Sequence, residues 1–112
     1  MALTEAVINF NYNKAIGKAA ELDAAASQLE ADAVTEIGTI VTAIKRDWEG
    51  KNSDEYTSKC LAEQRKLQDI ANDLRTTAST IRTMAENIKQ AELKALAIAR
   101  AAAEAAAAAI KK

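Results

Sequence analysis

The sequence contains no proline, no histidine and a single cysteine, Cys60, and aromatic residues make up only 4% of its 112 residues. The absence of histidine excludes Ser-His-Asp and Cys-His catalytic arrangements. One cysteine can form neither an internal disulfide nor a zinc site with several protein ligands. The three glycines stand far apart, so no glycine-rich phosphate-binding loop is present. We therefore predict a protein that is not an enzyme and that binds no cofactor or metal.

Long apolar runs and basic runs are also missing. No stretch approaches the roughly 18 apolar residues of a membrane span, and no charged start followed by an apolar run indicates a signal peptide. The longest basic runs are two residues, so we expect no nucleic-acid partner. Residues 1–50 carry eight acidic and four basic side chains, whereas residues 51–112 carry eight and eleven. This opposite charge favours antiparallel pairing of the two halves.

Strong helix formers, with alanine foremost, dominate what is present. A helical apolar stripe with spacings of three and four predicts a helix over about 14–47 and continues to Trp48 in the loop: Leu22, Ala26, Leu29, Ala33, Ile37, Ile40, Ile44 and Trp48. A predicted loop follows at 48–52, and Asn52 or Ser53 is the candidate N-cap of a second helix. Two heptad rows then follow over about 53–92: Cys60, Leu67, Leu74, Ile81, Ile88, Ala95, and Glu63, Ile70, Thr77, Met84, Ala91, Ile98.

The two ends of the chain have patterns of their own. Within residues 1–13, Ile8, Phe10 and Tyr12 alternate with asparagines at a period of two, and we predict a poorly ordered or partner-dependent N-terminal arm over 1–13. The tail 93–112 is rich in alanine and is expected to continue the second helix. Pairing outward from the loop leaves residues 87–110 as an overhang, where Leu93, Leu96 and Ile98 are candidate partner-docking residues.

These elements predict an all-α protein, an antiparallel helix-turn-helix hairpin that associates into a four-helix bundle, because apolar positions outside the paired stripes, such as Ile16, Val41 and Leu61, stay uncovered in a single hairpin. The predicted hairpin or dimer interface consists of Leu22, Leu29, Ile37, Ile40, Ile44, Leu67, Ile70, Leu74, Ile81, Met84 and Ile88. Cys60 fits this interface as a small buried or half-buried side chain, and a reactive or intermolecular thiol is the alternative.

Trp48 is the only tryptophan and lies two residues before Gly50. One interpretation is structural: the indole closes the end of the helix pair, and Gly50 supplies the positive φ that ends the helix. The other is functional: an indole at a turn is presented to a partner. The two interpretations are compatible.

Trp48-Glu49-Gly50, in the short loop of a helix-turn-helix chain of about 100 residues, resembles the WXG motif of the early-secreted-antigen superfamily. The stretch "ELDAAASQLEADA" before the loop and "WEGKNSDEY" at the loop fit this resemblance, which covers residues 14–90.

The resemblance implies a protein exported by type VII secretion systems of Gram-positive bacteria and mycobacteria. It implies a homodimer or a heterodimer with another small helical protein, and an adaptor or chaperone role for a larger toxin with a helical N-terminal domain. Trp48 and Gly50 would then be the targeting loop, which forms a composite signal with a partner's C-terminal tail, and a secretion ATPase would be a further partner. The chain would be cytoplasmic before export and secreted or cell-surface afterwards.

One feature departs from the family's pattern. Many members or their partners carry an aromatic-x-x-x-acid signal after the second helix, but no aromatic residue follows Tyr56 here. This favours a heteromeric adaptor whose partner supplies the tail. The alternatives are a self-contained homodimeric secreted effector, an intracellular coiled-coil scaffold, and a membrane-surface helix formed by the alanine-rich tail.

Overall fold

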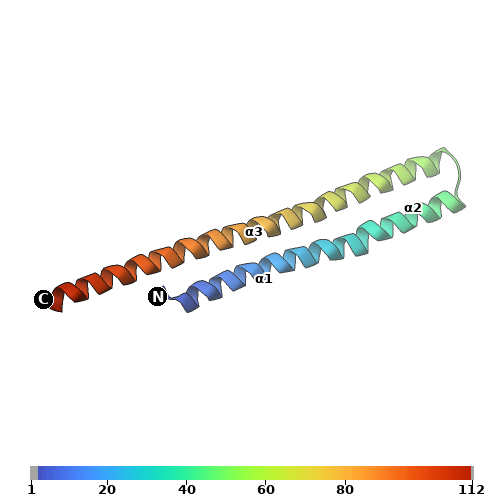
Figure 1. The fold of residues 1–112 in the computed structure, drawn as a ribbon. Coiled ribbons are helices and arrows are strands. Elements are labelled where there is room, and N and C mark those ends of the chain that lie inside the picture. Colours follow the sequence, from blue (N-terminus) through green and yellow to red (C-terminus); the bar gives the residue numbers. More distant parts are fainter. Residues whose placement is uncertain (1–2, 112) are drawn as a thin grey trace. The chain divides into compact units, whose positions relative to one another are not determined.

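The computed structural model describes residues 3–111, and almost all of them are helical (Figure 1). Helix α1 spans Glu5–Leu29, the π-helical turn η1 spans Glu30–Val34, and helix α2 spans Thr35–Asp47. Helix α3 spans Lys51–Lys111, a length of 61 residues. The absence of proline lets helices of this length run without a break, and the high alanine content favours them.

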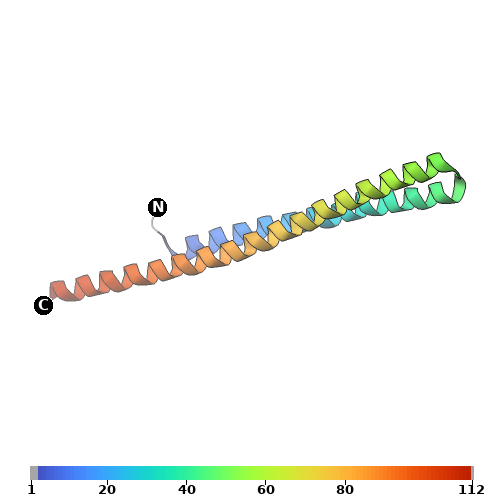
Figure 2. The same ribbon diagram turned by 90° about the horizontal axis from the view of Figure 1, so that it is seen from above.

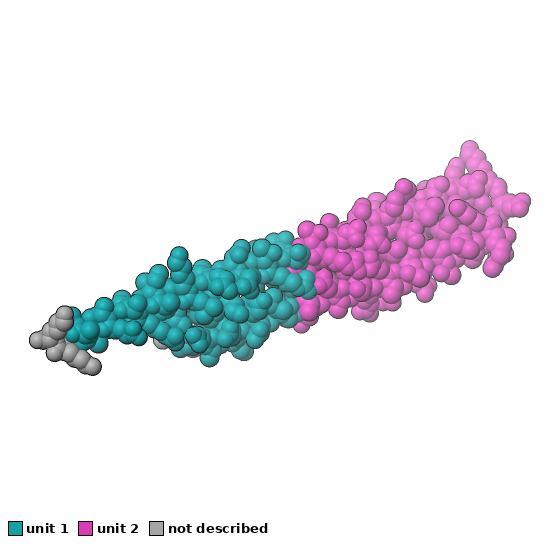
Figure 3. Space-filling view, in the orientation of Figure 1, with its two compact units in different colours: residues 1–19, 79–112 teal, residues 20–78 magenta. Residues whose placement is uncertain are grey.

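The chain divides into two compact units (Figure 3). Unit 2 consists of residues 20–78 and contains η1, α2 and the connection to α3. Unit 1 consists of residues 1–19 and 79–112, so it joins the first part of α1 to the second part of α3. Each unit has its own pairing of helical segments.

In unit 2 the chain reverses direction after α2, and both ribbon views place α2 beside the first part of α3 (Figures 1 and 2). Side-chain hydrogen bonds show the direction of the pairing. The Gln64 amide donates to the Val34 carbonyl at 2.9 Å, and the Gln68 amide donates to the Glu30 carboxylate at 2.6 Å. Residue numbers therefore rise along α3 as they fall along the segment that it faces, so the two segments run antiparallel.

The buried residues are mostly alanine. In unit 2, Ala26, Ala71 and Ala78 have no exposed surface, and Val41 is also buried. In unit 1, Ala19 and Ile8 are buried, together with Ala85. Small side chains allow the helix backbones to approach closely, but each contributes little apolar area. The helices are thus joined by a narrow seam.

The predicted fold class, a hairpin that associates into a four-helix bundle, is wrong. The described part of the chain has helices as its regular structure, but these form only two long helical stretches, 5–47 and 51–111, and no compact bundle of four helices. A hairpin extending over the whole chain is not shown either. A four-helix bundle requires each helix to bury a broad apolar face against its neighbours, whereas these helices bury a seam of alanines and leave Ile70, Met84 and Ile88 exposed.

The ends of the chain also differ from the sequence pattern. Within the described residues, α1 begins at Glu5, where an arm over 1–13 was predicted; residues 1 and 2 lie outside the described part. Ile8 is buried and Tyr12 half-buried one helical turn apart, whereas Phe10 between them is 67% exposed, which is a helical rather than a period-two arrangement. Helix α3 continues to Lys111, and residue 112 of the predicted tail lies outside the described part.

Candidate partner-binding surface at the Trp48 turn

The turn between α2 and α3 is built by Trp48 and Gly50. Trp48 has an extended backbone, and its N–H donates to the Ile44 carbonyl at 2.8 Å, which ends α2. Gly50 has φ +114°, so the positive φ expected from the sequence is present. The Gly50 carbonyl accepts from the Asp54 N–H at 3.1 Å and from the Ser53 hydroxyl at 3.0 Å. Helix α3 therefore begins at Lys51, earlier than the predicted caps at Asn52 or Ser53.

This geometry leaves the Trp48 side chain partly in solvent. Trp48 is 47% exposed, and its ring lies 6.3 Å from that of Tyr56, centroid to centroid, at an interplanar angle of 51°. Tyr56 is 51% exposed. A tilted aromatic pair of this kind contributes about 0.5–1.5 kcal/mol beyond its area burial, so the contact favours this arrangement of the two rings while about half of each residue stays accessible.

An apolar groove of about 340 Å³ in unit 2 has Tyr56 of this aromatic pair in its wall. It is lined by Ile37, Ile40, Tyr56, Lys59, Cys60 and Glu63. Cys60 is a free thiol and half-buried. The groove combines aliphatic walls with one basic and one acidic side chain, a composition suited to a protein segment with both apolar and charged groups.

The remaining predicted interface residues occupy several environments. Leu22, Leu29, Ile37, Ile44, Leu67, Leu74 and Ile81 are half-buried, whereas Ile40, Ile70, Met84 and Ile88 are exposed. The buried positions on α3 instead follow Ala71, Ala78 and Ala85. The sequence analysis missed this alanine row because it followed the larger aliphatic side chains. A seven-residue spacing of alanines was the available signal.

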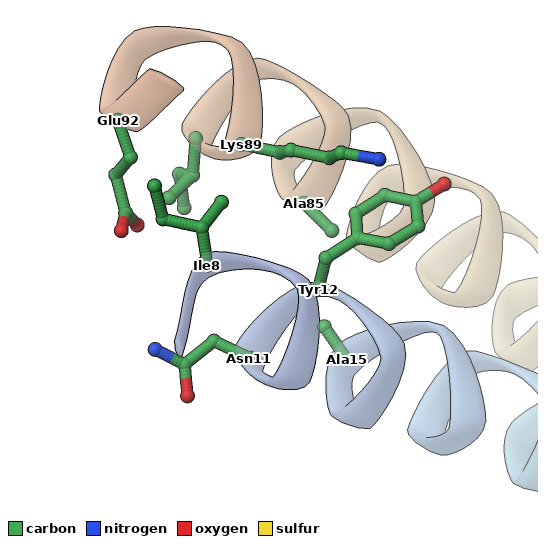
Figure 4. Close-up of a pocket in the computed structure, with 8 residues that line it drawn as sticks. Ile8, Asn11, Tyr12, Ala15, Ala85, Lys89 and Glu92 are labelled. Carbon is green, nitrogen blue, oxygen red and sulfur yellow. The ribbon is translucent and has the colours of Figure 1, made fainter. Parts of the chain in front are cut away.

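Unit 1 contains a smaller cavity of about 140 Å³ between α1 and α3 (Figure 4). Figure 4 shows Ile8 and Tyr12 of α1 facing Ala85 and Lys89 of α3, and the Lys89 ammonium lies 4.4 Å from the centre of the Tyr12 ring. Both residues are half-buried, and a cation-π contact contributes about 0.5–1 kcal/mol even at an exposed site. This cavity belongs to the packing of the helix pair.

The predicted overhang is shorter than the sequence indicated, because α1 begins nine residues before the predicted start at 14. Arg100 donates to the Glu5 carboxylate at 3.5 Å, so α3 has a neighbour in unit 1 as far as Arg100. Of the predicted docking residues, Leu93 and Leu96 are half-buried, and Ile98 is 61% exposed. Residues 101–110 are all exposed.

A polar cluster in unit 2 surrounds the π-helical turn. The Glu30 carboxylate accepts hydrogen bonds from both terminal nitrogens of Arg75 and from the Gln68 amide. The Arg75 hydrogen bonds, assisted by Gln68, lower the pKa of Glu30 to about 2. Glu30 raises the pKa of Arg75 in return. The pair is thus ionised throughout the neutral range and links η1 to α3.

No family model, no curated protein and no solved structure matches this chain. Among residues 3–111, no helix is long and apolar enough to cross a membrane. The same part of the chain contains no group of three or more histidine, cysteine, aspartate or glutamate side chains that could hold a metal ion.

Proposed function

We propose that this chain is a small non-enzymatic type VII secretion protein that serves as an export adaptor or co-secreted partner of a larger toxin with a helical N-terminal domain. The observation that carries the proposal is the half-exposed Trp48 in a Trp-x-Gly turn, held against Tyr56 beside an apolar groove. Tryptophan and tyrosine are enriched among the residues that dominate binding energy at protein interfaces.

The turn suits recognition for a physical reason. The Trp48 backbone is fixed by its hydrogen bond to Ile44, and the following chain is fixed by two hydrogen bonds to the Gly50 carbonyl. An aromatic side chain that is already positioned loses little conformational freedom when a partner covers it. The turn therefore presents Trp48 to a partner at a small entropic cost.

Under this proposal the chain is made in the cytoplasm, pairs there with another small helical protein or with a second copy, and leaves the cell through the secretion system. The Trp48 turn would be read by the secretion ATPase. Because no aromatic residue follows Tyr56, the partner would supply the second part of the signal. A self-contained homodimeric effector remains the competing function.

The test is an affinity pull-down of the tagged chain from its native host, read by mass spectrometry and run in parallel with Trp48→Ala and Phe10→Ala. Phe10 is a matched control because it is also an exposed aromatic residue, located in unit 1. The adaptor function predicts that wild type and Phe10→Ala recover a large toxin, a second small helical protein or a secretion ATPase.

Trp48→Ala should recover these partners at least about tenfold less efficiently, which corresponds to a loss of about 1.4 kcal/mol. Recovery of the tagged chain with only its own untagged copies would favour the homodimeric effector. Equal recovery of partners by Trp48→Ala and wild type would show that the Trp48 turn is not the binding surface.

A further inference from the structure

The buried positions of unit 2 follow two different spacings. Beyond Ser53, which is buried in the first turn of α3, the buried residues of this helix are Thr57, Ala71 and Ala78, and these three are separated by whole multiples of seven residues. On the facing segment, Ala26 and Val41 are both buried but lie fifteen residues apart, one more than two heptads. One helix of the pair therefore contains an additional residue that its partner lacks.

The additional residue is accommodated in η1. The Thr35 backbone N–H donates to the Glu30 carbonyl, five residues back, where an α-helix would use the carbonyl four residues back. A single turn of this kind takes up one residue without breaking the helix. It lies between Ala26 and Val41, which is where the spacing changes.

The position of α2 depends on this turn. In an uninterrupted α-helix that starts from Ala26, the inward positions would continue to residue 40, as the apolar stripe in the sequence predicts. Instead Ile40 is 46% exposed and Val41 is 5% exposed. One residue corresponds to a rotation of about 100° around the helix axis, and this rotation moves Ile40 outward, into the wall of the groove beside Tyr56.

Side chains of α3 secure the turn at both ends. Arg75 and Gln68 hold Glu30 at its start, and Gln64 donates to the carbonyl of Val34 at its end. Gly38 leaves space for this last contact, because a Cβ there would lie 3.2 Å from the Gln64 amide nitrogen. The π turn is thus held by specific polar contacts from the partner helix.

We propose that η1 is a built-in one-residue frame shift that rotates α2 about the helix axis and thereby turns Ile40 outward to form the groove beside Tyr56. This inference stands on the contacts of unit 2 alone and does not depend on the secretion function. Its test uses purified full-length protein, so its failure and the failure of the proposed function are separate results.

The experiment combines thiol labelling with one-residue deletions. In a Cys60→Ala background, Ile40→Cys and Val41→Cys each provide a single thiol, whose reaction rate with a maleimide is measured. Both are then measured again in chains that lack Ala31, a residue of η1. The matched control is deletion of Ala62, because α3 has no additional residue to lose.

The frame shift predicts that the thiol of the Ile40→Cys chain reacts at least about tenfold faster than that of the Val41→Cys chain, since a buried thiol reacts only after local opening. Deletion of Ala31 should convert the π turn to an α turn, preserve this order of rates and leave the melting temperature unchanged or higher. Deletion of Ala62 should lower the melting temperature.

Two results would overturn the proposal. The first is faster labelling of Val41→Cys than of Ile40→Cys in chains without a deletion. The second is a fall in melting temperature on deleting Ala31 that is as large as the fall on deleting Ala62.

Discussion

At the scale of single residues, the turn depends on Gly50 and Trp48. Gly50 is the one described residue whose backbone lies at positive φ, and its carbonyl anchors the start of α3. The sequence was sufficient to predict this glycine conformation, because glycine is the residue that most readily adopts a positive φ where a helix ends. It did not predict that Tyr56 would be the ring that meets Trp48. The two residues lie on different helix ends, and only the geometry of the turn brings them together.

Gly50→Ala should destabilise the protein by about 1–2 kcal/mol, since an L-residue at positive φ brings its Cβ close to the backbone. No neighbouring atom would clash with the new Cβ, so the effect would come from backbone strain alone. Urea denaturation monitored by circular dichroism gives the free energy of unfolding. Glu49→Ala, at the exposed neighbouring position, is the control and should change stability by less than about 0.5 kcal/mol. Equal stability of Gly50→Ala and wild type would argue against the positive φ.

At the scale of elements, composition was sufficient to predict that the protein is helical. It was not sufficient to predict which face of each helix is buried. The sequence stripe placed Ile40 inward, whereas the structure places Val41 there, because the π turn adds a residue that no local sequence signal reveals. On α3, larger side chains such as Ile70 and Met84 suggested the seam, but the helices approach each other along alanines. Periodicity therefore identified the helices from about residue 14 onward and could not fix their rotation about their own axes.

Two helical glycines offer a comparison within the same chain. Gly17→Ala should stabilise the protein by about 0.5–1 kcal/mol, because alanine has the higher helix propensity and the new Cβ meets no atom within 4 Å. Gly38→Ala should give little or no net gain, because the new Cβ displaces Gln64 and weakens its hydrogen bond to Val34, worth about 0.5–1.5 kcal/mol.

The coupling is measured in a double-mutant cycle with Gln64→Ala. In the Gln64→Ala variant there is no hydrogen bond from Gln64 to Val34 to weaken. There Gly38→Ala should stabilise the protein by the full gain in helix propensity, as Gly17→Ala does in wild type. If Gly38→Ala stabilises the wild type as much as Gly17→Ala does, then the Gln64 contact does not constrain position 38.

The Glu30–Arg75 pair predicts a specific response to acid. Because folding lowers the pKa of Glu30 from 4.5 to about 2, its stabilising contribution is fully present above pH 4.5 and is lost as the pH falls toward 2. Glu30→Gln should therefore melt at a lower temperature than wild type at neutral pH, and the difference should shrink over this acidic range. Arg75→Gln removes the same ion pair. It should therefore also melt at a lower temperature than wild type at neutral pH, and this difference should shrink over the same acidic range. A constant difference between wild type and both variants down to pH 2 would contradict the lowered pKa.

At the scale of the whole molecule, the chain combines helices joined by narrow alanine seams with many exposed large apolar side chains. Phe10, Trp48, Tyr56, Ile70, Met84, Ile88 and Ile98 are each about half exposed or more. Single exposed apolar residues are ordinary, but an aromatic pair beside an apolar groove is a distinct surface. Composition alone indicated a protein without a cofactor site, and the surface at the turn supports the proposal that its role is to bind another protein.

The most direct test of this account is the export of Trp48→Ala from the native host, measured in the culture medium with the type VII secretion system intact and disrupted. Phe10→Ala is the control, and circular dichroism must show that both variants keep wild-type helicity. The account predicts that wild type and Phe10→Ala are exported only when the secretion system is intact, and that Trp48→Ala, or the partner it escorts, stays in the cell. Normal export of Trp48→Ala together with its partner would contradict the central claim.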